Sequence, residues 1–233
     1  MVQATLEAKE RWRHRFVMRS SGMAVADPYR FLFQDDSLGL TISRDFGTDN
    51  QVHEQVMQVR REGGGEPSFA FDAYSFHYSM LYDGQPIGAM TATRPVDGAI
   101  DCAEVYSPHL MTQYHDCLVS TCKFRINRSG CSSLRTLRTM VREFWRDQVD
   151  IGSRLNLINA DKKLIPFYQR IGYEVIEGSD FIHPTLGTDS IAMMMSADPN
   201  RRSFCSDIFA NLDDVLPMEE VVTSCYASPM MLS

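Results

Sequence analysis

The chain has 233 residues, of which 44% are hydrophobic and 10% aromatic, so one domain with a sizeable core is expected. The formal net charge of −7 excludes nucleic-acid binding through bulk positive charge, although a local basic patch is compatible with it. Apolar runs fall well short of the ~20 residues that span a bilayer, and the N-terminus lacks an apolar export signal. We therefore expect a cytoplasmic protein, a monomer or homodimer, with no transmembrane segment and no nucleic-acid partner.

The N-terminal region of the chain predicts two helices around an irregular stretch. Residues 4–18 are rich in charge and carry apolar side chains at helical spacing, and residues 50–61 repeat this pattern. Gly, Pro, Asp and Ser between short apolar pieces predict an irregular stretch over 20–50. Three glycines at 63–65 and Pro67 then form a strong break, which separates an N-terminal helical region from the core.

After this break the pattern is that of strands alternating with helices. Strands are expected at 75–82, 87–94, 118–126, 153–159, 173–177 and 190–195, and helices along 134–145 and 161–171. Asp83-Gly84 predicts a tight hairpin turn between the first two strands. This order predicts an α/β domain, a mixed sheet flanked by helices. The domain boundaries expected are an N-terminal helical extension over residues 1–66, a core over 67–198, and a tail over 199–233 that either packs on the core or stays mobile.

One helix and the strand after it carry a family resemblance. Phe167-Tyr168, followed by Gly172-Tyr173, resembles the ending of a helix in GNAT acyltransferases, and it comes after a strand that ends at Asn159, as in that family. The resemblance implies the GNAT (acyl-CoA N-acyltransferase) fold. It also implies that a thioester arm lies between two parted strands, and that the strand 119–126 offers a backbone N–H to the thioester carbonyl.

Further motifs are similar to one branch of this fold, the N-acyl amino acid synthases and the acyl-homoserine-lactone synthases. They are Asp72 to His77, Asp83-Gly84 with Arg94-Pro95 after it, and His183-Pro184. The resemblance covers roughly residues 70–196. It implies a donor carried on the phosphopantetheine of an acyl carrier protein. The loop before the long helix matches the CoA-binding pattern at Gly130 but departs from it elsewhere, so acyl-CoA and acyl carrier protein both stay open as donors.

The start of the long helix is the expected donor site, because unpaired backbone N–H groups at a helix N-terminus attract phosphate. The residues expected to bind the donor are Phe124, Arg125, Ile126, Asn127, Arg128, Gly130, Cys131 and Ser132. The same segment is rich in cations, namely Lys123, Arg125, Arg128, Arg135, Arg138, Arg142 and Arg146. This basic cluster either docks an acidic carrier protein or CoA phosphates, or it is the solvated face of a helix.

Acyl transfer to an amine requires a base, stabilisation of an oxyanion and protonation of the leaving thiolate. The resemblance implies that Tyr168 protonates the thiolate, the alternative being a core tyrosine. Candidates for the base are Glu104, His77 and His183, since histidine titrates near neutral pH. His183 is also a candidate for shaping the acceptor pocket. Arg94 either binds an acceptor carboxylate through its guanidinium fork or forms a structural ion pair.

The six cysteines and six histidines show no ligand spacing typical of a metal site, so we predict reduced thiols and no metal. The leading hypothesis is an N-acyltransferase that moves an acyl group from a pantetheine thioester to the amine of an amino acid or a similar small molecule. Two alternatives remain: acetyl-CoA-dependent acetylation or aminoacyl transfer on the same scaffold, and a non-catalytic binding module.

Overall fold

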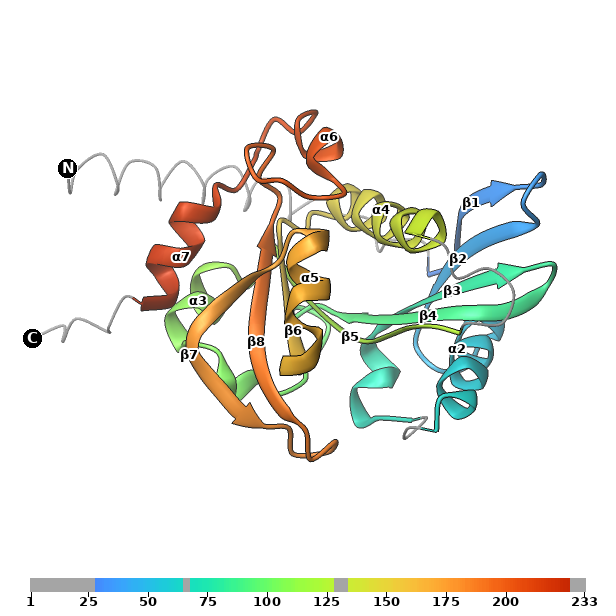
Figure 1. The fold of residues 1–233 in the computed structure, drawn as a ribbon, viewed down its shortest axis with the longest axis horizontal. Helices are drawn as coiled ribbons and strands as arrows, with labels where there is room; N and C mark the ends of the chain where they lie inside the picture. Colours follow the sequence, from blue (N-terminus) through green and yellow to red (C-terminus); the bar gives the residue numbers. More distant parts are fainter. Residues whose placement is uncertain (1–27, 65–67, 128–133, 227–233) are drawn as a thin grey trace, which may run out of the picture.

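The computed structural model describes residues 28–64, 68–127 and 134–226 (Figure 1). Eight strands among these residues form one sheet in the order β1-β2-β3-β4-β5-β6-β8-β7. The strands are β1 Arg30–Asp35, β2 Leu40–Phe46, β3 Phe76–Tyr82, β4 Gln85–Thr93, β5 Leu118–Ile126, β6 Leu155–Asp161, β7 Glu174–Ile182 and β8 Asp189–Ser196. Neighbouring strands are antiparallel, except that β5 and β6 are parallel.

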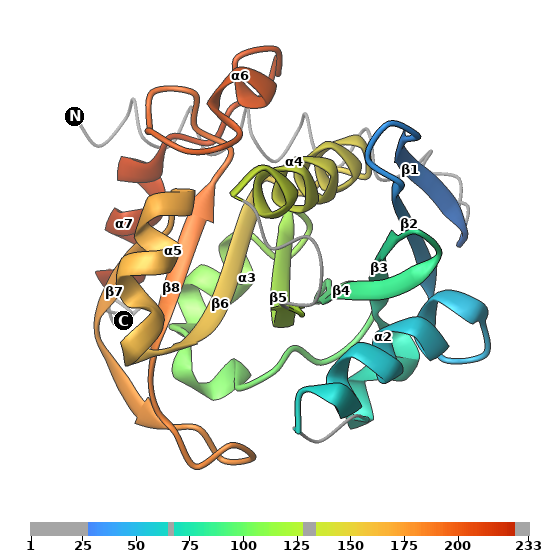
Figure 2. The same ribbon diagram turned by 45° about the vertical axis from the view of Figure 1, so that its right-hand side comes forward.

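Helices cover both faces of the sheet (Figure 2). They are α2 Gln51–Glu62, α3 Pro108–Gln113, α4 Leu134–Asp150, α5 Ile165–Ile171, α6 Ser206–Phe209 and α7 Met218–Tyr226, with 3-10 turns η1 Ala70–Tyr74, η2 Ala103–Val105 and η3 Lys162–Leu164. One core cluster joins the sheet to α4, α5 and α6, and the opposite face packs against α3 and α7. Alternate side chains of β8 pack on opposite faces of the sheet, since Met193 and Met195 belong to one core cluster and Met194 belongs to the other.

The core elements predicted from the sequence are confirmed, and the N-terminal region differs. The predicted α/β architecture is present, and the helix expected at 50–61 is α2. The irregular stretch expected over 20–50 is wrong in part, because it contains β1 and β2. In β2 the inward positions are Leu40, Ile42 and Arg44, and a buried arginine interrupts the apolar alternation that marks a strand. The helix expected at 4–18 lies outside the described residues.

The chain after residue 198 packs on the core as far as it is described. Phe209 of α6 is fully buried, with its ring edge-on to Trp145 of α4 at a centroid distance of 4.9 Å. Met218 and Val221 of α7 are buried in the cluster on the other face. Packing, rather than mobility, is therefore the outcome for this portion of the expected tail. No helix of the described segments is long and apolar enough to cross a membrane.

A buried carboxylate joins α4 to the strands below it. Asp147 accepts a hydrogen bond from Tyr78 Oη at 2.6 Å, and Nε of the buried Arg44 lies 3.3 Å away. At the surface end, Arg30 contacts Asp147 at 3.1 Å and Asp150 at 2.8 Å. This network fixes the orientation of α4, whose beginning borders the region where the site is expected.

We predict that Asp147→Ala lowers the free energy of unfolding by about 3–5 kcal/mol, because Arg44 would lose a buried anionic partner. Asp150→Ala is the matched control on the same helix. Its side chain is 54% exposed, so its loss should lower stability by about 1 kcal/mol or less. Urea unfolding followed by circular dichroism measures both, and equal effects of the two substitutions would contradict this assignment.

Candidate active site

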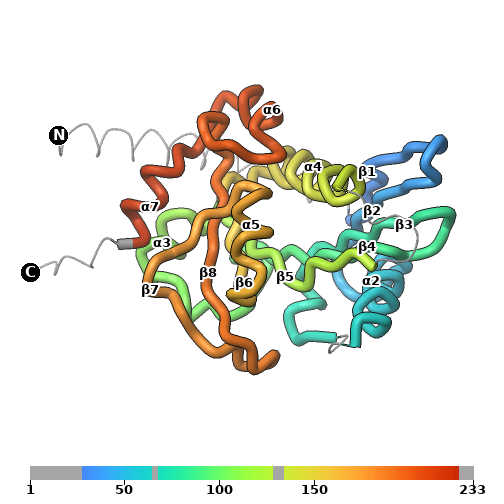
Figure 3. The backbone as a smooth tube through the Cα atoms, in the orientation of Figure 1, coloured from blue at the N-terminus to red at the C-terminus, as the bar shows by residue number. Residues whose placement is uncertain are grey.

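The parallel strands β5 and β6 separate partway along their length. They pair from Leu118 with Leu155 to Thr121 with Ile158, and no further. Beyond this point β5 continues along β4 as far as Ile126, while β6 continues along β8 as far as Asp161. Each strand is therefore held by its other neighbour, and a gap opens between them (Figure 3).

A bulge lies in β5 where the gap begins. Ala89 of β4 pairs with Arg125 and Thr91 pairs with Cys122, so two residues, Lys123 and Phe124, face the single residue Met90. Lys123 adopts a φ of 54°, a left-handed conformation that side chains other than glycine rarely adopt. Such a bulge redirects backbone and side-chain groups away from the regular ladder, here next to the gap.

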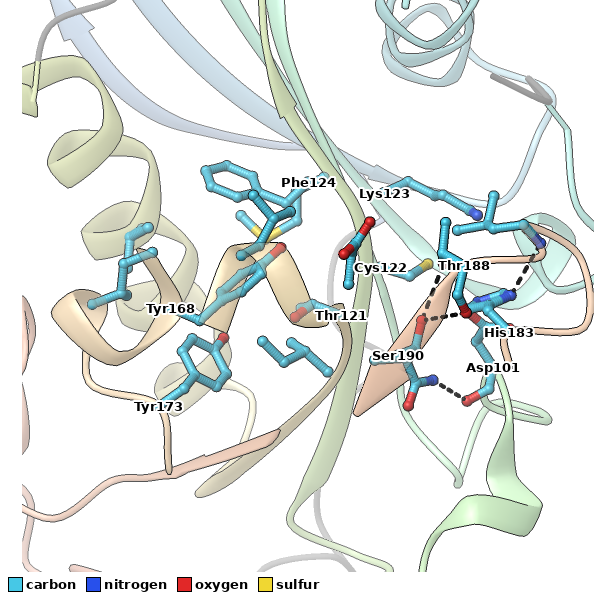
Figure 4. Close-up of a pocket in the computed structure, with 18 of the residues that line it drawn as sticks. Asp101, Thr121, Cys122, Lys123, Phe124, Tyr168, Tyr173, His183, Thr188 and Ser190 are labelled. Carbon is cyan, nitrogen blue, oxygen red and sulfur yellow. Dashed lines mark hydrogen bonds and ion pairs between the residues drawn. The ribbon is translucent and has the colours of Figure 1, made fainter. Parts of the chain in front are cut away.

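A cavity of about 210 Å³ occupies the gap. Aromatic residues Tyr168 and Tyr173 lie together at one end, with Phe124 near them, and Asp101 and His183 lie at the other end (Figure 4). The remaining lining residues are divided equally between apolar ones, namely Met90, Val141, Phe144, Ile158, Leu164, Ile171 and Leu186, and polar ones, namely Thr121, Cys122, Lys123, Asn159, Asp161, Thr188 and Ser190.

Tyr168 is placed by a short helix whose two ends are well defined. Asp161 caps the turn before α5 by accepting the backbone N–H of Lys163 at 2.9 Å. Gly172 ends α5 with a φ of 127°, and a Cβ there would lie 2.4 Å from Cβ of Ser203, so this position requires glycine. Burial raises the pKa of Tyr168 to about 12, so its hydroxyl is protonated at neutral pH.

The polar end of the cavity contains three side chains that meet. Nε2 of His183 lies 3.3 Å from Oδ2 of Asp101 and 3.8 Å from Sγ of Cys102, and Cys102 Sγ lies 3.5 Å from Asp101 Oδ1. No metal site is expected from the sequence, because the cysteines and histidines show no local ligand spacing. Three potential ligand atoms nevertheless lie within 4.8 Å of one another, since the fold brings together Asp101 and His183, which are 82 positions apart.

Lys123 contributes a cation to the same region. Its ammonium lies 4.0 Å from the centroid of the Phe69 ring, and it forms no ion pair with any residue in the described ranges. Burial lowers the pKa of Lys123, with Arg60 adding to this effect and Asp101 and the neighbouring thiols opposing it. A partly desolvated lysine next to a cavity is suited to binding an anionic group of a ligand.

Three of the residues predicted from the sequence line the cavity, namely Tyr168, His183 and Phe124. Arg125, Ile126 and Asn127, expected to bind the donor, lie at the end of β5 beyond the lining residues. Arg125 donates to the backbone oxygen of Gly63, and Asn127 donates to Glu62, so both tie β5 to the end of α2. The other expected donor residues, Arg128, Gly130, Cys131 and Ser132, lie outside the described residues.

Three further candidates do not line the cavity. His77 is completely buried between Thr91 and the backbone oxygen of Asp72, and burial lowers its pKa to about 4. Glu104 is exposed on η2. Arg94 forms a two-point ion pair with Asp97, at 2.7 and 3.0 Å, which corresponds to the structural alternative considered for it.

Among the polar lining residues that were not selected as site residues from the sequence are Asp101, Lys123, Asn159 and Asp161. Asn159 and Asp161 could have been selected from the sequence, because they lie just after the portion of β6 that pairs with β5. Asp101 comes from a segment between β4 and β5 that carries no recognisable motif. Lys123 was noted only as a member of a basic cluster, because nothing in the amino-acid sequence of β5 indicates a bulge.

The cysteines in and beside the cavity have weakly acidic thiols. Burial raises the pKa of Cys102 to about 12 with Asp101 adding to the effect, and burial raises that of Cys122 to about 12 as well. Since the thiolate is the reactive form, neither cysteine is suited to act as a nucleophile at neutral pH. Any acyl transfer in this cavity would therefore proceed without an acyl-cysteine intermediate.

We predict that iodoacetamide alkylates Cys102 and Cys122 at pH 8 about 10³-fold more slowly than free cysteine, because the thiolate fraction falls by that factor. Peptide mapping by mass spectrometry measures both sites separately, and the unfolded chain in urea provides the control for reagent reactivity. Labelling of either site in the folded protein at the rate of free cysteine would show that its thiol is activated.

Comparisons with solved structures identify the fold. The chain matches the structure of the acyl-homoserine-lactone (AHL) synthase LasI with a TM-score of 0.51 and 13% identity, over 67% of this chain and 88% of LasI. FeeM, an N-acyl amino acid synthase from uncultured soil microbes, matches with a TM-score of 0.51 and 14% identity, over 62% and 88%. A protein from Bacillus halodurans matches with a TM-score of 0.50 and 10% identity, over 72% and 90%.

Sequence comparison adds nothing to this result, since no protein-family model and no curated protein matches the chain. Sequence identities this low show a shared fold only. The activity therefore has to be argued from the candidate active site. The structural matches, together with the mixed sheet in which β5 and β6 separate, confirm the fold that the Phe167-Tyr168 motif implied. The chain has the GNAT acyltransferase fold, with AHL and N-acyl amino acid synthases among the proteins that share it.

Proposed function

We propose that the protein is an N-acyltransferase that moves an acyl group from a pantetheine thioester to the amine of an amino acid. The observation that carries this proposal is the gap between β5 and β6, which begins after Thr121 and Ile158 and contains the cavity. Backbone groups along an unpaired strand edge can bond an extended pantetheine arm in the manner of an added strand. The two ends of the cavity then serve the two substrates, the thioester near Tyr168 and the acceptor near Asp101.

The reaction has a simple balance of atoms. The amine nitrogen attacks the thioester carbonyl carbon, the carbonyl oxygen becomes an oxyanion, and the carbon–sulfur bond then breaks to give an amide and a thiol. A backbone N–H of the bulge at Lys123 and Phe124 stabilises the oxyanion, because a fixed donor costs no reorganisation during the reaction. Tyr168 donates its hydroxyl hydrogen bond to the departing sulfur, and its raised pKa keeps that hydrogen in place.

Lys123 supports an acceptor that carries a carboxylate. Its ammonium has no ion-pair partner among the described residues and belongs to the same cavity lining as Asp101. A carboxylate bound by Lys123 and an amine directed toward Asp101 together describe an amino acid. FeeM is named as an N-acyl amino acid synthase, which agrees with this acceptor class.

The donor is either acyl-CoA or an acyl carrier protein. Much of the expected basic cluster along α4 is engaged within the chain, since Arg142 pairs with Asp207 at 2.6 and 2.7 Å and Arg146 pairs with Glu143. Arg135 stays 70% exposed while contacting Asp35, and Arg138 is also exposed, so these two described members of the cluster are placed to meet an anionic donor. Assays with acetyl-CoA, long-chain acyl-CoA and acyl-loaded carrier protein decide between these donors.

We predict that Tyr168→Phe lowers kcat by about 10²-fold, because the departing sulfur loses its hydrogen-bond donor. The matched control is Tyr114→Phe, which removes a buried hydroxyl paired with Ser224 away from the cavity. Release of free thiol, followed with a chromogenic disulfide, measures the rate. Unchanged turnover in the Tyr168 variant would favour a core role for this tyrosine. Donor binding without turnover in the wild-type protein would favour the non-catalytic module.

We predict that Lys123→Met raises KM for an amino acid at least tenfold and removes the preference for the amino acid over its carboxamide, because the carboxylate would lose its cationic partner. The amide acceptor itself should react equally well with both proteins. Lys162→Met is the control, since Lys162 pairs with Asp180 and Asp189 and does not line the cavity. A discrimination between acid and amide that survives in Lys123→Met would contradict this role.

A further inference from the structure

The two ring nitrogens of His183 have different neighbours. Nδ1 accepts the backbone N–H groups of Thr185 and Leu186, both at 3.3 Å, so the ring caps the turn that follows it. A neutral imidazole carries one hydrogen on its ring nitrogens. The nitrogen that accepts two N–H hydrogen bonds is the unprotonated one. The hydrogen is therefore on Nε2, which faces Asp101 Oδ2 at 3.3 Å. His183 is locked in the tautomer that donates to Asp101.

This tautomer argues against a metal ion in the cluster. The separations of 3.3, 3.5 and 3.8 Å between the three side-chain atoms are close to the roughly 3.3–3.6 Å edges expected around a tetrahedral zinc ion. A metal on Nε2, however, would require the hydrogen on Nδ1, and a metal-bound histidine normally donates that hydrogen to an acceptor. In this structure two N–H donors point at Nδ1 instead.

The segment that carries Asp101 is also fixed at the edge of the gap. The backbone oxygen of Asp101 accepts a hydrogen bond from Asn159 Nδ2 at 3.0 Å, and Asn159 Oδ1 accepts one from Tyr106 Oη at 2.8 Å. Asn159 is the first residue of β6 beyond its pairing with β5. The carboxylate of Asp101 is 15% exposed and lines the cavity, so it is held in place and still reachable.

We propose that Asp101 is the base that accepts the proton of the attacking amine, and that His183 is a positioning residue that holds the Asp101 carboxylate. This inference rests on the proposed acyl transfer. The acceptor loses one proton to solvent before it reacts as a free amine. As the carbon–nitrogen bond forms, the nitrogen gives a second proton to Asp101. When the carbon–sulfur bond breaks, the sulfur leaves as a thiolate that accepts the hydrogen bond of Tyr168 and takes a proton from water, and Asp101 releases its proton to water.

Several titratable groups surround this carboxylate. His183 faces it from the turn between β7 and β8, Lys123 and Cys122 from β5, and Cys102 and Tyr106 from its own segment. Lys123 and the His183 N–H place positive charge and a hydrogen-bond donor beside the Asp101 carboxylate, whereas the thiols and the phenol are neutral at neutral pH, because burial raises the pKa of each. This arrangement places the carboxylate beside the acceptor with no second anion next to it.

The first experiment compares Asp101→Asn with Glu104→Gln, a change of the same kind three residues along the segment on an exposed side chain. We expect Asp101→Asn to lower kcat by about 10²–10⁴-fold while an acyl-CoA thioether that cannot transfer its acyl group still binds, and Glu104→Gln to act near the wild-type rate. Near-normal turnover in Asp101→Asn, or the larger loss in Glu104→Gln, would overturn the assignment of the base.

The second experiment separates positioning from structure through the pH profile of kcat/KM for the acceptor. In His183→Leu the Asp101 carboxylate loses a hydrogen-bond donor, so the break that this carboxylate adds to the acidic limb, below the break set by the acceptor amine, should move to higher pH. His183→Gln offers an amide N–H in place of Nε2–H and should restore the wild-type limb. An acidic limb that is the same in wild type and in His183→Leu would overturn the positioning role.

Two results would overturn the proposal more broadly. Loss of activity on chelation with recovery on added Zn²⁺ would show that the cluster binds a metal and that Asp101 is a ligand. A wild-type protein that transfers no acyl group from any of the donors tested would remove the proposed function and the base together. Turnover that is insensitive to Asp101 would remove the base alone, so the two failures are distinguishable.

Discussion

The proposed site depends on a short stretch of parallel pairing between β5 and β6. Four residues of each strand pair, and each strand then follows its outer neighbour, β4 or β8. The backbone groups that face the gap must find partners elsewhere, because an unpaired polar group in a closed interior is costly. An extended ligand with amide groups of its own meets that requirement. The gap is therefore a property of the sheet, and in the proposed function it is also the place where the donor binds.

The two ends of the cavity differ in chemical character because different segments build them. The aromatic end comes from α5 and the start of β7, where Tyr168 and Tyr173 contact each other at a ring distance of 5.7 Å. The charged end comes from the segment before α3, the bulge of β5 and the turn between β7 and β8. In the proposed reaction, the phenol of Tyr168 on one side and the carboxylate of Asp101 on the other separate the hydrogen-bond donor to the sulfur from the base. Such a separation allows both to act at one pH.

The sequence predicted the core of the fold and only a portion of the site. Apolar periodicity revealed α4 and the core strands, and the Phe167-Tyr168 motif placed Tyr168 and implied the GNAT fold. Periodicity failed in β2, where Arg44 occupies an inward position and contacts Asp147. The pairing of Asp101 with His183 joins positions that are far apart in the chain, so no local pattern could show it. The bulge at Lys123 was also hidden, because no glycine marks its positive φ.

The most direct test is a crystal structure of the protein with an acyl-CoA thioether in which a methylene group prevents transfer. We predict that the pantetheine arm lies between β5 and β6, with its sulfur within hydrogen-bonding distance of the Tyr168 hydroxyl and its acyl oxygen next to the bulge at Lys123 and Phe124. An arm bound outside the gap, or β5 and β6 closed on each other with the ligand excluded, would contradict it.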